Sequence, residues 1–309
     1  MRIIFMGTPD FAVPCLKSLI EAGHEICAVF TQSDKPKGRG YTLTPPPIKV
    51  LALENNIEVF QPKTLRTTEA TLAIQSLNPD VIVVVAYGKM LPKAILDIPQ
   101  FGCINVHASL LPKYRGAAPI QWSVINGDKV TGVTTMFMAE GLDTGDMLLT
   151  EQTEIGLDET AGELQDRLSL IGAALLVKTL EEVKSGTAKR RPQPAASSTE
   201  YASMLTKELS HIDWNQSADV IHNLVRGLSP WPVANTIYQN KLLKIHRVRN
   251  IEGYDGKIGQ AADLNGLFVV CCGLNTAIEL VEVQYEGGKR MSGKDFLRGH
   301  PMDIETVLK

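Results

Sequence analysis

Two polar side chains that can act on a carbonyl group stand close together in the middle of the chain. Asn105 and His107 end an apolar run that begins at Cys103. If this run is a β-strand, residues two apart lie on the same face. Asn105 could then donate a hydrogen bond to a developing oxyanion while His107 moves a proton. Asp143, in a glycine-flanked loop, could orient the imidazole, so these residues suit acyl transfer without a covalent intermediate.

An isolated Asn-x-His pair is more often two polar residues at a sheet edge than a catalytic pair, so the flanking residues decide its meaning. Residues 105–116 read NVHASLLPKYRG, and residues 141–146 read GLDTGD. Together these blocks resemble the signature of the folate-dependent formyltransferases. Residues 117–121, AAPIQ, and residues 7–12, GTPDFA, are similar to the members that formylate the methionyl initiator tRNA.

The resemblance implies transfer of the formyl group of 10-formyltetrahydrofolate to the α-amino group of methionine on the initiator tRNA, for translation initiation. In it Asn105 stabilises the tetrahedral oxyanion, His107 relays a proton, and Asp143 is the orienting or acid/base partner of His107. Which of the last two takes the amine proton stays open. The folate ring is expected against apolar walls and backbone groups, as in cofactor sites generally. The residues expected there are Tyr87, Gly88, Leu91, Pro92, Ser109, Leu110, Leu111 and Pro112.

Two basic stretches are candidates for RNA contact. Residues 33–40, SDKPKGRG, carry three cations in five positions. Such a run is usually a solvated surface loop, but the resemblance implies a loop that inserts toward the acceptor end of the tRNA. Lys37 and Arg39 are therefore expected to contact RNA through phosphate or stacking. Lys244 and Arg247 belong to a second basic stripe, which is either a solvated edge strand or part of the same RNA surface.

Alternating strand and helix patterns predict how the catalytic residues are held. Short β-branched runs indicate strands at residues 3–6, 26–30, 81–86, 103–106 and 133–138. Helical spacing recurs at residues 11–22, 48–55, 67–77 and 159–185. This order predicts a doubly wound, mostly parallel α/β sheet of the Rossmann-like type. Ligands of such sheets bind beyond the carboxyl ends of the strands, which is where Asn105 and His107 fall.

Changes of composition divide the chain. Residues 1–187 are expected to form the formyltransferase catalytic domain, and residues 188–205, which lack an apolar period, a linker. Residues 206–309 are expected to form a smaller β-rich, tRNA-binding domain in which Ser217 caps a helix. Its strands are predicted at residues 233–238, 241–248, 267–271 and 276–283, which permits a small barrel, and the resemblance implies an OB-like one.

The overall composition is that of a globular protein, with 309 residues, 44% of them hydrophobic and 21% charged. The formal net charge is −3, and residues 206–309 hold 12 Lys plus Arg against 12 Asp plus Glu. RNA binding must therefore depend on local basic patches. The longest apolar run, residues 81–86, is far too short to span a bilayer, and the N-terminus builds no signal peptide. A cytoplasmic monomer without membrane contact is expected.

Other classes of site are disfavoured by what the sequence lacks. Five cysteines without a C-x-x-C pair argue against a disulfide framework and a zinc site, and no metal is expected. Gly7 stands alone, so the dinucleotide pattern G-x-G-x-x-G is missing and a nicotinamide oxidoreductase is a poor candidate. Two alternatives remain: a folate formyltransferase or hydrolase that acts on a small amine or on water, and a folate- or RNA-binding protein without turnover.

Overall fold

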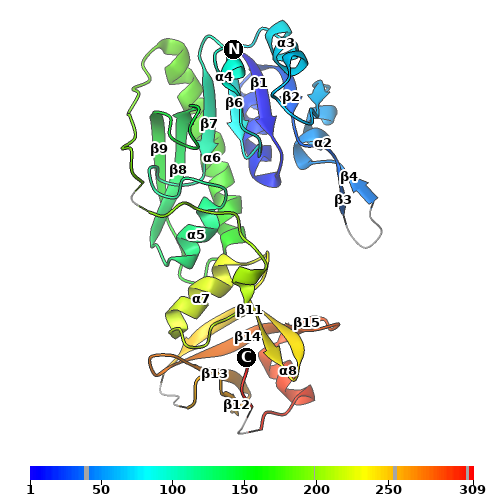
Figure 1. Ribbon diagram of the computed structural model, residues 1–309, viewed down its shortest axis with the longest axis vertical. Coiled ribbons are helices and arrows are strands. Elements are labelled where there is room, and N and C mark those ends of the chain that lie inside the picture. Colours follow the sequence, from blue (N-terminus) through cyan, green and yellow to red (C-terminus); the bar gives the residue numbers. More distant parts are fainter. Residues whose placement is uncertain (38–41, 198, 253–255, 304–305) are drawn as a thin grey trace. The chain divides into compact units, whose positions relative to one another are not determined.

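The computed structural model describes residues 1–37, 42–197, 199–252, 256–303 and 306–309, and they form two compact units (Figure 1). The N-terminal unit comprises residues 1–116, 130–154 and 165–202, and the C-terminal unit comprises residues 117–129, 155–164 and 203–309. The segment expected as a linker, residues 188–205, is therefore divided between them, with residues 188–202 in the N-terminal unit. Among the described residues no helix is both long and apolar enough to cross a bilayer.

Seven strands form the sheet of the N-terminal unit, in the order β5-β2-β1-β6-β7-β8-β9. The first five in this order are parallel, and β8 and β9 are added antiparallel. This confirms the predicted mostly parallel α/β sheet. The strands are β1 (Arg2–Gly7), β2 (Glu25–Phe30), β5 (Val59–Phe60), β6 (Val81–Val85), β7 (Cys103–His107), β8 (Val130–Phe137) and β9 (Met147–Glu154).

Helices connect these strands, and a short hairpin of β3 and β4 extends from the unit beside α2 (Figure 1). The side chain of Thr67 accepts a hydrogen bond from the Ala70 N–H and so caps α3 at its predicted start. The helices are α1 (Val13–Glu21), preceded by the 3₁₀ turn Asp10–Ala12, α2 (Pro47–Glu54), α3 (Thr68–Ser76), α4 (Lys93–Leu96) and α6 (Ala161–Ser185); the hairpin strands are β3 (Lys35–Lys37) and β4 (Thr42–Thr44).

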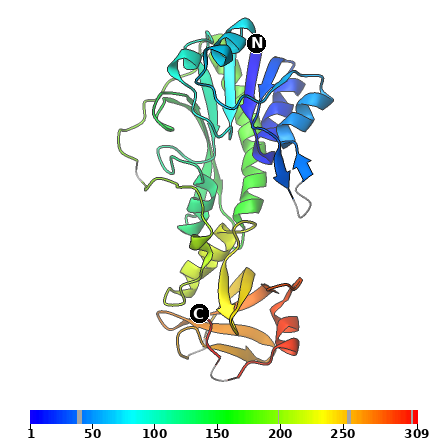
Figure 2. The ribbon, with the colours of Figure 1, turned by 45° about the vertical axis from the view of Figure 1, so that its right-hand side comes forward.

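The two faces of this sheet have different covers. On one face side chains of β1, β2 and β6 pack with buried residues of α3 and α4, together with Cys103 of β7. On the other face α6, the long green helix in Figure 2, lies against β7 and β8. A Cβ atom on Gly172 of α6 would stand 3.0 Å from Cγ1 of Val106, so glycine permits this close approach. Thr135 of β8 and Thr179 of α6 share a hydrogen bond of 2.8 Å there.

The C-terminal unit is built on an antiparallel sheet in the order β10-β11-β14-β13-β12, with β15 paired to β14. Its buried residues, among them Phe268 and Phe296, form a core of their own. This confirms the smaller β-rich, OB-like domain. The strands are β10 (Asn235–Tyr238), β11 (Lys241–Ile251), β12 (Ala261–Leu264), β13 (Leu267–Cys272), β14 (Thr276–Tyr285) and β15 (Arg290–Ser292), and the helices are α5 (Pro119–Ile125), α7 (Ala218–Gly227) and α8 (Gly293–Gly299).

Local sequence explains the turns and the cap in this unit. Gln239 and Asn240 both have positive φ, 48° and 61°, as a two-residue type I′ hairpin requires. Asn265 and Gly266, with φ of 54° and 86°, join β12 to β13 in the same way. The side chain of Ser217 accepts from the N–H of residue 220 and caps α7, as its position before the helical pattern predicts.

The ion pair between Arg249 and Glu279 gives a prediction for stability. These residues face each other across β11 and β14, and Nε and Nη2 of Arg249 donate to Glu279 Oε2 at 2.9 and 2.5 Å. Glu279 is only 7% exposed. Arg249→Ala would leave this carboxylate unpaired, so we expect the free energy of unfolding to fall by about 2 kcal/mol, between the values for exposed and buried pairs. Urea unfolding measures this loss.

The pair of Arg290 with Glu282 provides the matched control. It joins strands of the same sheet at 2.5 Å, but the Glu282 side chain is 31% exposed against 10% for Glu279. Arg290→Ala should therefore cost only about 0.5 kcal/mol, because water replaces the lost partner. Equal losses in the two variants would contradict the role assigned to burial.

Candidate active site

The strand β7 carries Asn105 and His107 to the carboxyl end of the parallel strands. Both point to the same face as Cys103, two and four residues earlier, while Val106 between them points to α6. Asn105 is half-buried, and His107 is 6% exposed. Within the described part of the chain the Asn105 amide has no hydrogen-bond partner. Its N–H groups can therefore be donated to a ligand.

The contacts of His107 fix which of its ring nitrogens carries a proton. Nε2 lies 3.0 Å from the carbonyl oxygen of Tyr114. A carbonyl can only accept, so Nε2 is the protonated, donating nitrogen. Nδ1 lies 3.8 Å from Oδ2 of Asp143. In neutral His107 Nδ1 is therefore the free base, and a proton that arrives there creates an imidazolium beside a carboxylate.

Asp143 is held in place through both its backbone and its side chain. Its φ is +51°, a conformation that non-glycine residues seldom adopt. Oδ2 accepts a hydrogen bond of 2.9 Å from the N–H of Gly116, and the side chain is 13% exposed. Gly116 itself has a φ of +132°, which favours glycine. The predicted trio of Asn105, His107 and Asp143 is thus brought together from β7 and the loop that follows β8.

The loop after β7 is fixed to β8 by one hydroxyl. Oγ1 of Thr134 donates to the Ser109 carbonyl at 2.7 Å and accepts from the Leu111 N–H at 3.2 Å. The Ser109 hydroxyl in turn donates to the Lys113 carbonyl at 2.6 Å. These bonds turn the chain back so that the Tyr114 carbonyl meets His107. The loop therefore helps to determine the tautomer of the histidine.

The segment from residue 191 to residue 199 also contributes to this site, which the sequence did not predict. Arg191 and Met147 exchange two backbone hydrogen bonds of 2.9 Å. Gln193 donates to the carbonyl of Asp143 at 2.9 Å, and the Thr199 hydroxyl accepts from the Tyr114 N–H at 2.7 Å. The signal that could have indicated this role is the group of polar side chains in residues 193–199, QPAASST.

The residues predicted for the folate ring fall into two groups. Tyr87 and Leu91 are buried in the core beneath α3 and α4, and the Tyr87 carbonyl already accepts from Thr8 at 3.2 Å and Gln32 at 3.0 Å. Burial raises the pKa of Tyr87 to about 12, and its hydroxyl has no partner among the described residues. Ser109 and Leu111 are buried as well. The exposed or half-buried members are Gly88, Pro92, Leu110 and Pro112.

The two loops of this group start at adjacent strands. β6 and β7 are parallel neighbours, so residues 87–92 and 109–112 follow strand ends at the same edge of the sheet. Gly88, with a φ of +78°, forms the sharp turn after β6. The contacts with Thr8 and Gln32 occupy both lone pairs of the Tyr87 carbonyl.

The residues predicted to contact RNA lie in both units. Arg39 lies outside the described residues, and Lys37 is the last residue of β3, paired with Thr42. Lys244 and Arg247 both lie on β11, three residues apart, which in a regular strand would place them on opposite faces. The pairing with β14 is irregular around residues 245–248, and this bulge turns both away from the core.

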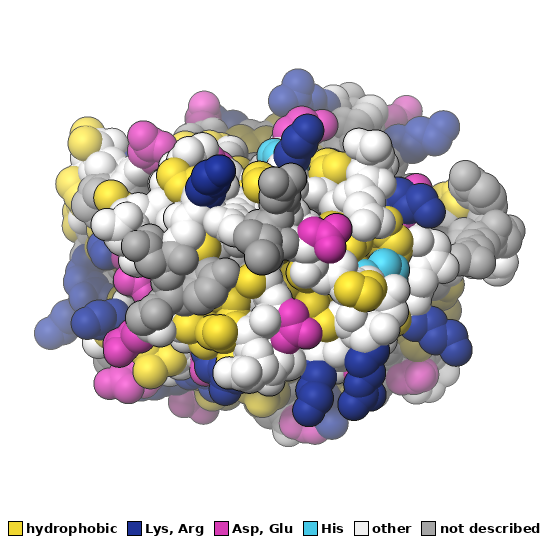
Figure 3. Space-filling view, turned by 90° about the horizontal axis from the view of Figure 1, so that it is seen from below, with side chains coloured by type: hydrophobic (Ala, Val, Ile, Leu, Met, Phe, Trp, Pro, Cys, Tyr) yellow, Lys and Arg dark blue, Asp and Glu magenta, His cyan; other side chains and the backbone are white. Residues whose placement is uncertain are grey.

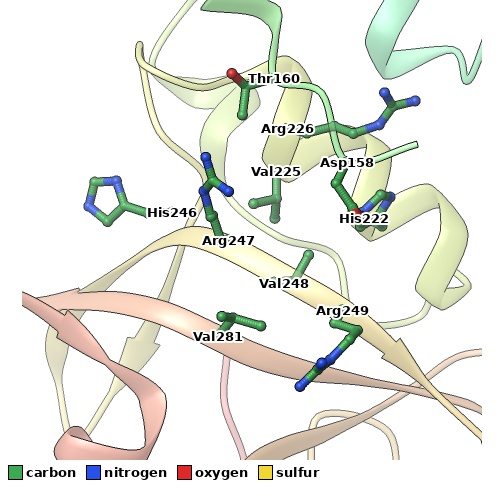
Figure 4. Close-up of a pocket in the computed structure, with 10 residues that line it drawn as sticks. All are labelled: Asp158, Thr160, His222, Val225, Arg226, His246, Arg247, Val248, Arg249 and Val281. Atoms are coloured by element: carbon green, nitrogen blue, oxygen red, sulfur yellow. The ribbon is translucent and has the colours of Figure 1, made fainter. Parts of the chain in front are cut away.

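Arg247 lines a pocket of about 230 Å³ in the C-terminal unit. Figure 4 shows side chains of α7, β11 and β14 around it, including Arg226, Arg247 and Arg249. Arg247 and Arg249 have anionic partners, Glu163 at 3.0 Å and Glu279 at 2.5 Å. Arg226 instead donates to the neutral oxygens of Asn223, Gly156 and Glu159, and Nε2 of His222 lies 3.0 Å from Oδ1 of Asp158. Hydrogen bonds from the Thr160 N–H and hydroxyl, more than Arg247, hold the pKa of Glu163 below its ordinary value.

The face of the C-terminal unit in Figure 3 shows the same mixture of charges. Lys and Arg side chains lie mainly at the margin, and acidic and hydrophobic side chains lie among them. Lys244 has no ion pair among the residues that the structure describes. It is the clearer of the two predicted cations for an anionic partner, because a ligand would not have to displace a carboxylate.

Metal chemistry has no candidate in the described residues. No group of three or more His, Cys, Asp or Glu side chains is gathered there so that it could hold a metal ion. The cysteines at positions 15, 103, 271 and 272 are buried, and Cys27 is half-buried.

Comparisons with known proteins identify both parts of the chain. A model of the formyl transferase family matches residues 1–180, and a model of the formyl transferase C-terminal domain matches residues 204–301. The methionyl-tRNA formyltransferase of Alkaliphilus oremlandii is 51% identical over 309 residues, which are 100% of this chain and 99% of the relative. The enzyme of the same name from Pelotomaculum thermopropionicum is 52% identical, with 100% and 98% covered.

Solved structures share the fold at lower identity. The N-formyltransferase of Helicobacter canadensis, in complex with folinic acid and dTDP-3-aminofucose, is 19% identical with a TM-score of 0.69, and 91% of this chain and 98% of that one are covered. HypX of Aquifex aeolicus, in complex with tetrahydrofolic acid, is 16% identical with a TM-score of 0.65, and 96% and 47% are covered. The resemblance carried by residues 105–116 and 141–146 is thereby confirmed: the chain belongs to the formyl transferase family.

Proposed function

We propose that this chain transfers the formyl group of 10-formyltetrahydrofolate to the α-amino group of methionyl initiator tRNA, for translation initiation. The observation that carries the proposal is the placement of Asn105, His107 and Asp143 at the carboxyl end of β7. The acceptor is supported by full-length relatives of about half identity that are named for methionyl-tRNA. The donor is supported by the reduced folates in two structures of the same fold.

In the proposed reaction the neutral amine attacks the formyl carbon. Asn105 donates an N–H to the oxygen as it becomes an oxyanion, and Nδ1 of His107 accepts the proton that the attacking nitrogen loses. Asp143 stabilises the resulting imidazolium. When the tetrahedral intermediate collapses, the bond from carbon to N10 of the folate breaks, and that nitrogen takes the proton back from His107.

His107, rather than Asp143, is proposed as the group that takes the proton. Nδ1 of His107 is free to accept because Nε2 holds the ring proton against the Tyr114 carbonyl. Oδ2 of Asp143 already accepts from the Gly116 N–H. Imidazole is also the stronger base of the two types of group. Asp143 therefore contributes its negative charge and not a proton site.

The residues around the strand ends fit a flat and largely apolar ring. Leu110 and Pro112 are half-buried and present apolar surface beside the catalytic strand. Gly88 is exposed and leaves its backbone open to a ligand. Because the carbonyl of Tyr87 is already used, we propose that the buried Tyr87, Leu91, Ser109 and Leu111 support the two folate loops from the core. Gly88, Pro92, Leu110 and Pro112 then face the ring.

The remaining expectations are carried as parts of the same proposal. Residues 1–187 form the catalytic domain, and residues 206–309 bind the tRNA together with Lys37 and Arg39. The protein acts as a monomer in the cytoplasm. Neither formyl transfer nor RNA binding through these residues calls for a metal.

The test is formyl transfer from 10-formyltetrahydrofolate with purified full-length protein. The acceptors are methionyl initiator tRNA, the same tRNA uncharged, methionyl elongator tRNA, a dTDP-3-amino sugar and buffer alone. Product on the charged initiator only supports the proposal. Transfer to the sugar alone would make the protein a small-amine formyltransferase, release of formate in buffer alone a hydrolase, and no reaction with any acceptor a protein that binds without turnover. Each of these three results contradicts the proposal.

The RNA contact of Lys244 can be tested by its charge. Lys244→Gln should raise the KM for methionyl initiator tRNA and leave kcat unchanged. The plot of log affinity against log salt should become shallower by about 1, because one phosphate contact is lost. Arg247→Gln should act in the same direction. Lys17→Gln, an equal change of charge on an exposed residue of α1, is the control; an identical salt slope in all variants would exclude the contact.

A further inference from the structure

Arg115 is a buried cation in the N-terminal unit whose partners are all neutral oxygens in the described residues. It is 9% exposed. Nε and Nη2 donate to Oε1 of Gln193 at 3.0 and 2.8 Å, and the other bonds reach the carbonyls of Pro194 at 2.8 Å and Ala195 at 3.3 Å. Keeping a guanidinium buried without a carboxylate is costly. Arg115 directs its guanidinium donors to residues 193–195, so its charge is placed to hold this segment.

Gln193 transmits this contact to the loop of Asp143. Its Nε2 donates to the carbonyls of Asp143 at 2.9 Å and Gly145 at 2.7 Å. Arginine has no acceptor and a carbonyl has no donor, so the amide can be oriented in only one way. Both lone pairs of Oε1 and both N–H groups of Nε2 are then used. Gln193 is a saturated link between Arg115 and the backbone of residues 143–145.

The loop of residues 143–145 has a backbone geometry that its own residues do not favour. Asp143 has a φ of +51°. At Gly145 a Cβ atom would stand 1.8 Å from the Phe137 carbonyl oxygen, so the chain passes very close to the end of β8. Backbone conformations of this kind persist only where surrounding contacts impose them. Gln193 supplies two such contacts within three residues.

The contacts close a ring around the carboxylate. Arg115 binds Gln193, Gln193 binds the backbone of Asp143, and Oδ2 of Asp143 accepts from the N–H of Gly116, which follows Arg115 in the chain. A shift of either residue 115 or residue 193 therefore moves the carboxylate relative to Nδ1 of His107. Neither Arg115 nor Gln193 contacts His107 in any hydrogen bond among the described residues.

We infer that Arg115 and Gln193 are positioning residues that hold the Asp143 carboxylate where it stabilises protonated His107. The inference rests on the proposed function, because it needs Asp143 to act in formyl transfer. It predicts a loss in kcat with the KM values for folate and tRNA nearly unchanged. Since a displacement of about 1 Å from the productive geometry can cost about 100-fold, we expect kcat to fall 10- to 100-fold on loss of the link.

Gln193→Glu is the sharpest variant. It keeps the shape and the bonds to Arg115, but it replaces the two N–H donors with an oxygen that faces two carbonyls. Arg115→Lys is a milder second variant, because lysine keeps the charge and cannot make the two parallel bonds to Oε1. Lys189→Gln is the control; this residue precedes the segment that contributes to the site, and its side chain is exposed. Its kcat should change less than twofold.

A double-mutant cycle with Asp143→Asn separates positioning from general destabilisation. If Gln193 acts through the carboxylate, Gln193→Glu should reduce kcat 10- to 100-fold in the native background and less than threefold in the Asp143→Asn background. Equal reductions in both backgrounds, or no reduction in either positioning variant, would overturn the inference. Normal activity of Asp143→Asn by itself would instead overturn the proposed role of Asp143. Urea unfolding of each variant, compared with its kcat, shows whether the loss follows stability.

Discussion

Replacing Asn105 with alanine should lower kcat for formyl transfer by about 100- to 1,000-fold. The reason is that the Asn105 amide is half-buried, has no partner among the described residues and stands two positions before His107 on the same face of β7. Its N–H groups are therefore free to bond the formyl oxygen when charge develops on it. Steady-state kinetics with methionyl initiator tRNA, together with the dissociation constant of the folate, measure this effect.

Binding of the folate should be almost unchanged in this variant, because the ground-state formyl oxygen gains little from the donor. Asn105→Asp is the matched variant: it has nearly the same shape but offers no N–H and adds a negative charge. It should reduce kcat at least as much as alanine. A variant that loses folate affinity while keeping its kcat would show that Asn105 binds the ligand and does not stabilise the oxyanion.

Replacing His107 with glutamine should reduce kcat by about 100- to 10,000-fold. Glutamine can donate an amide N–H to the Tyr114 carbonyl in place of Nε2, so the loop after β7 keeps its anchor. It cannot take a proton, so the attacking amine must lose its proton to water. Single-turnover formyl transfer, which excludes product release, is the suitable measurement.

Asp143→Asn is the companion to this variant. An asparagine oxygen can still accept from the Gly116 N–H, but the negative charge 3.8 Å from Nδ1 is lost. We expect a smaller loss than for His107→Gln, because the base remains and only the stabilisation of its protonated form is removed. If Asp143→Asn were the more impaired of the two, the carboxylate and not the imidazole would be the proton acceptor.

The parts of this site that lie on strands could be predicted from the sequence, because strands have a regular pattern of side chains. Apolar runs rich in β-branched residues identified β1, β2, β6 and β7, and a strand alternates its faces by geometry alone, so the shared face of Asn105 and His107 followed. The family resemblance added Asp143, which lies 36 positions after His107. The helix caps at Thr67 and Ser217 are also local, because each depends on residues three positions apart.

The parts that depend on contacts between loops far apart in the sequence could not be predicted. Residues 191–199 have no apolar period, and the bonds of Gln193 and Thr199 to the catalytic loops run between side chains and backbone groups, which leave no periodic signal. The position of the proton on His107 depends on the contact between Nε2 and the Tyr114 carbonyl, which lies seven residues further along the chain. The strand β9 was missed because it is a polar edge strand, and α5 because its seven residues are too few to establish a helical period.

Gly172 of α6 packs against the face of β7 that is opposite Asn105 and His107. The absence of a side chain there sets the spacing between α6 and β7 at Val106, the single residue that separates Asn105 from His107. A methyl group at this position would press on Cγ1 of Val106, whose displacement would shift the strand that carries both catalytic side chains. Substitution of Gly172 could thus lower turnover by displacing β7, although α6 lies on the face of the sheet opposite the catalytic side chains. The residues that matter for turnover therefore include one on a helix behind the site.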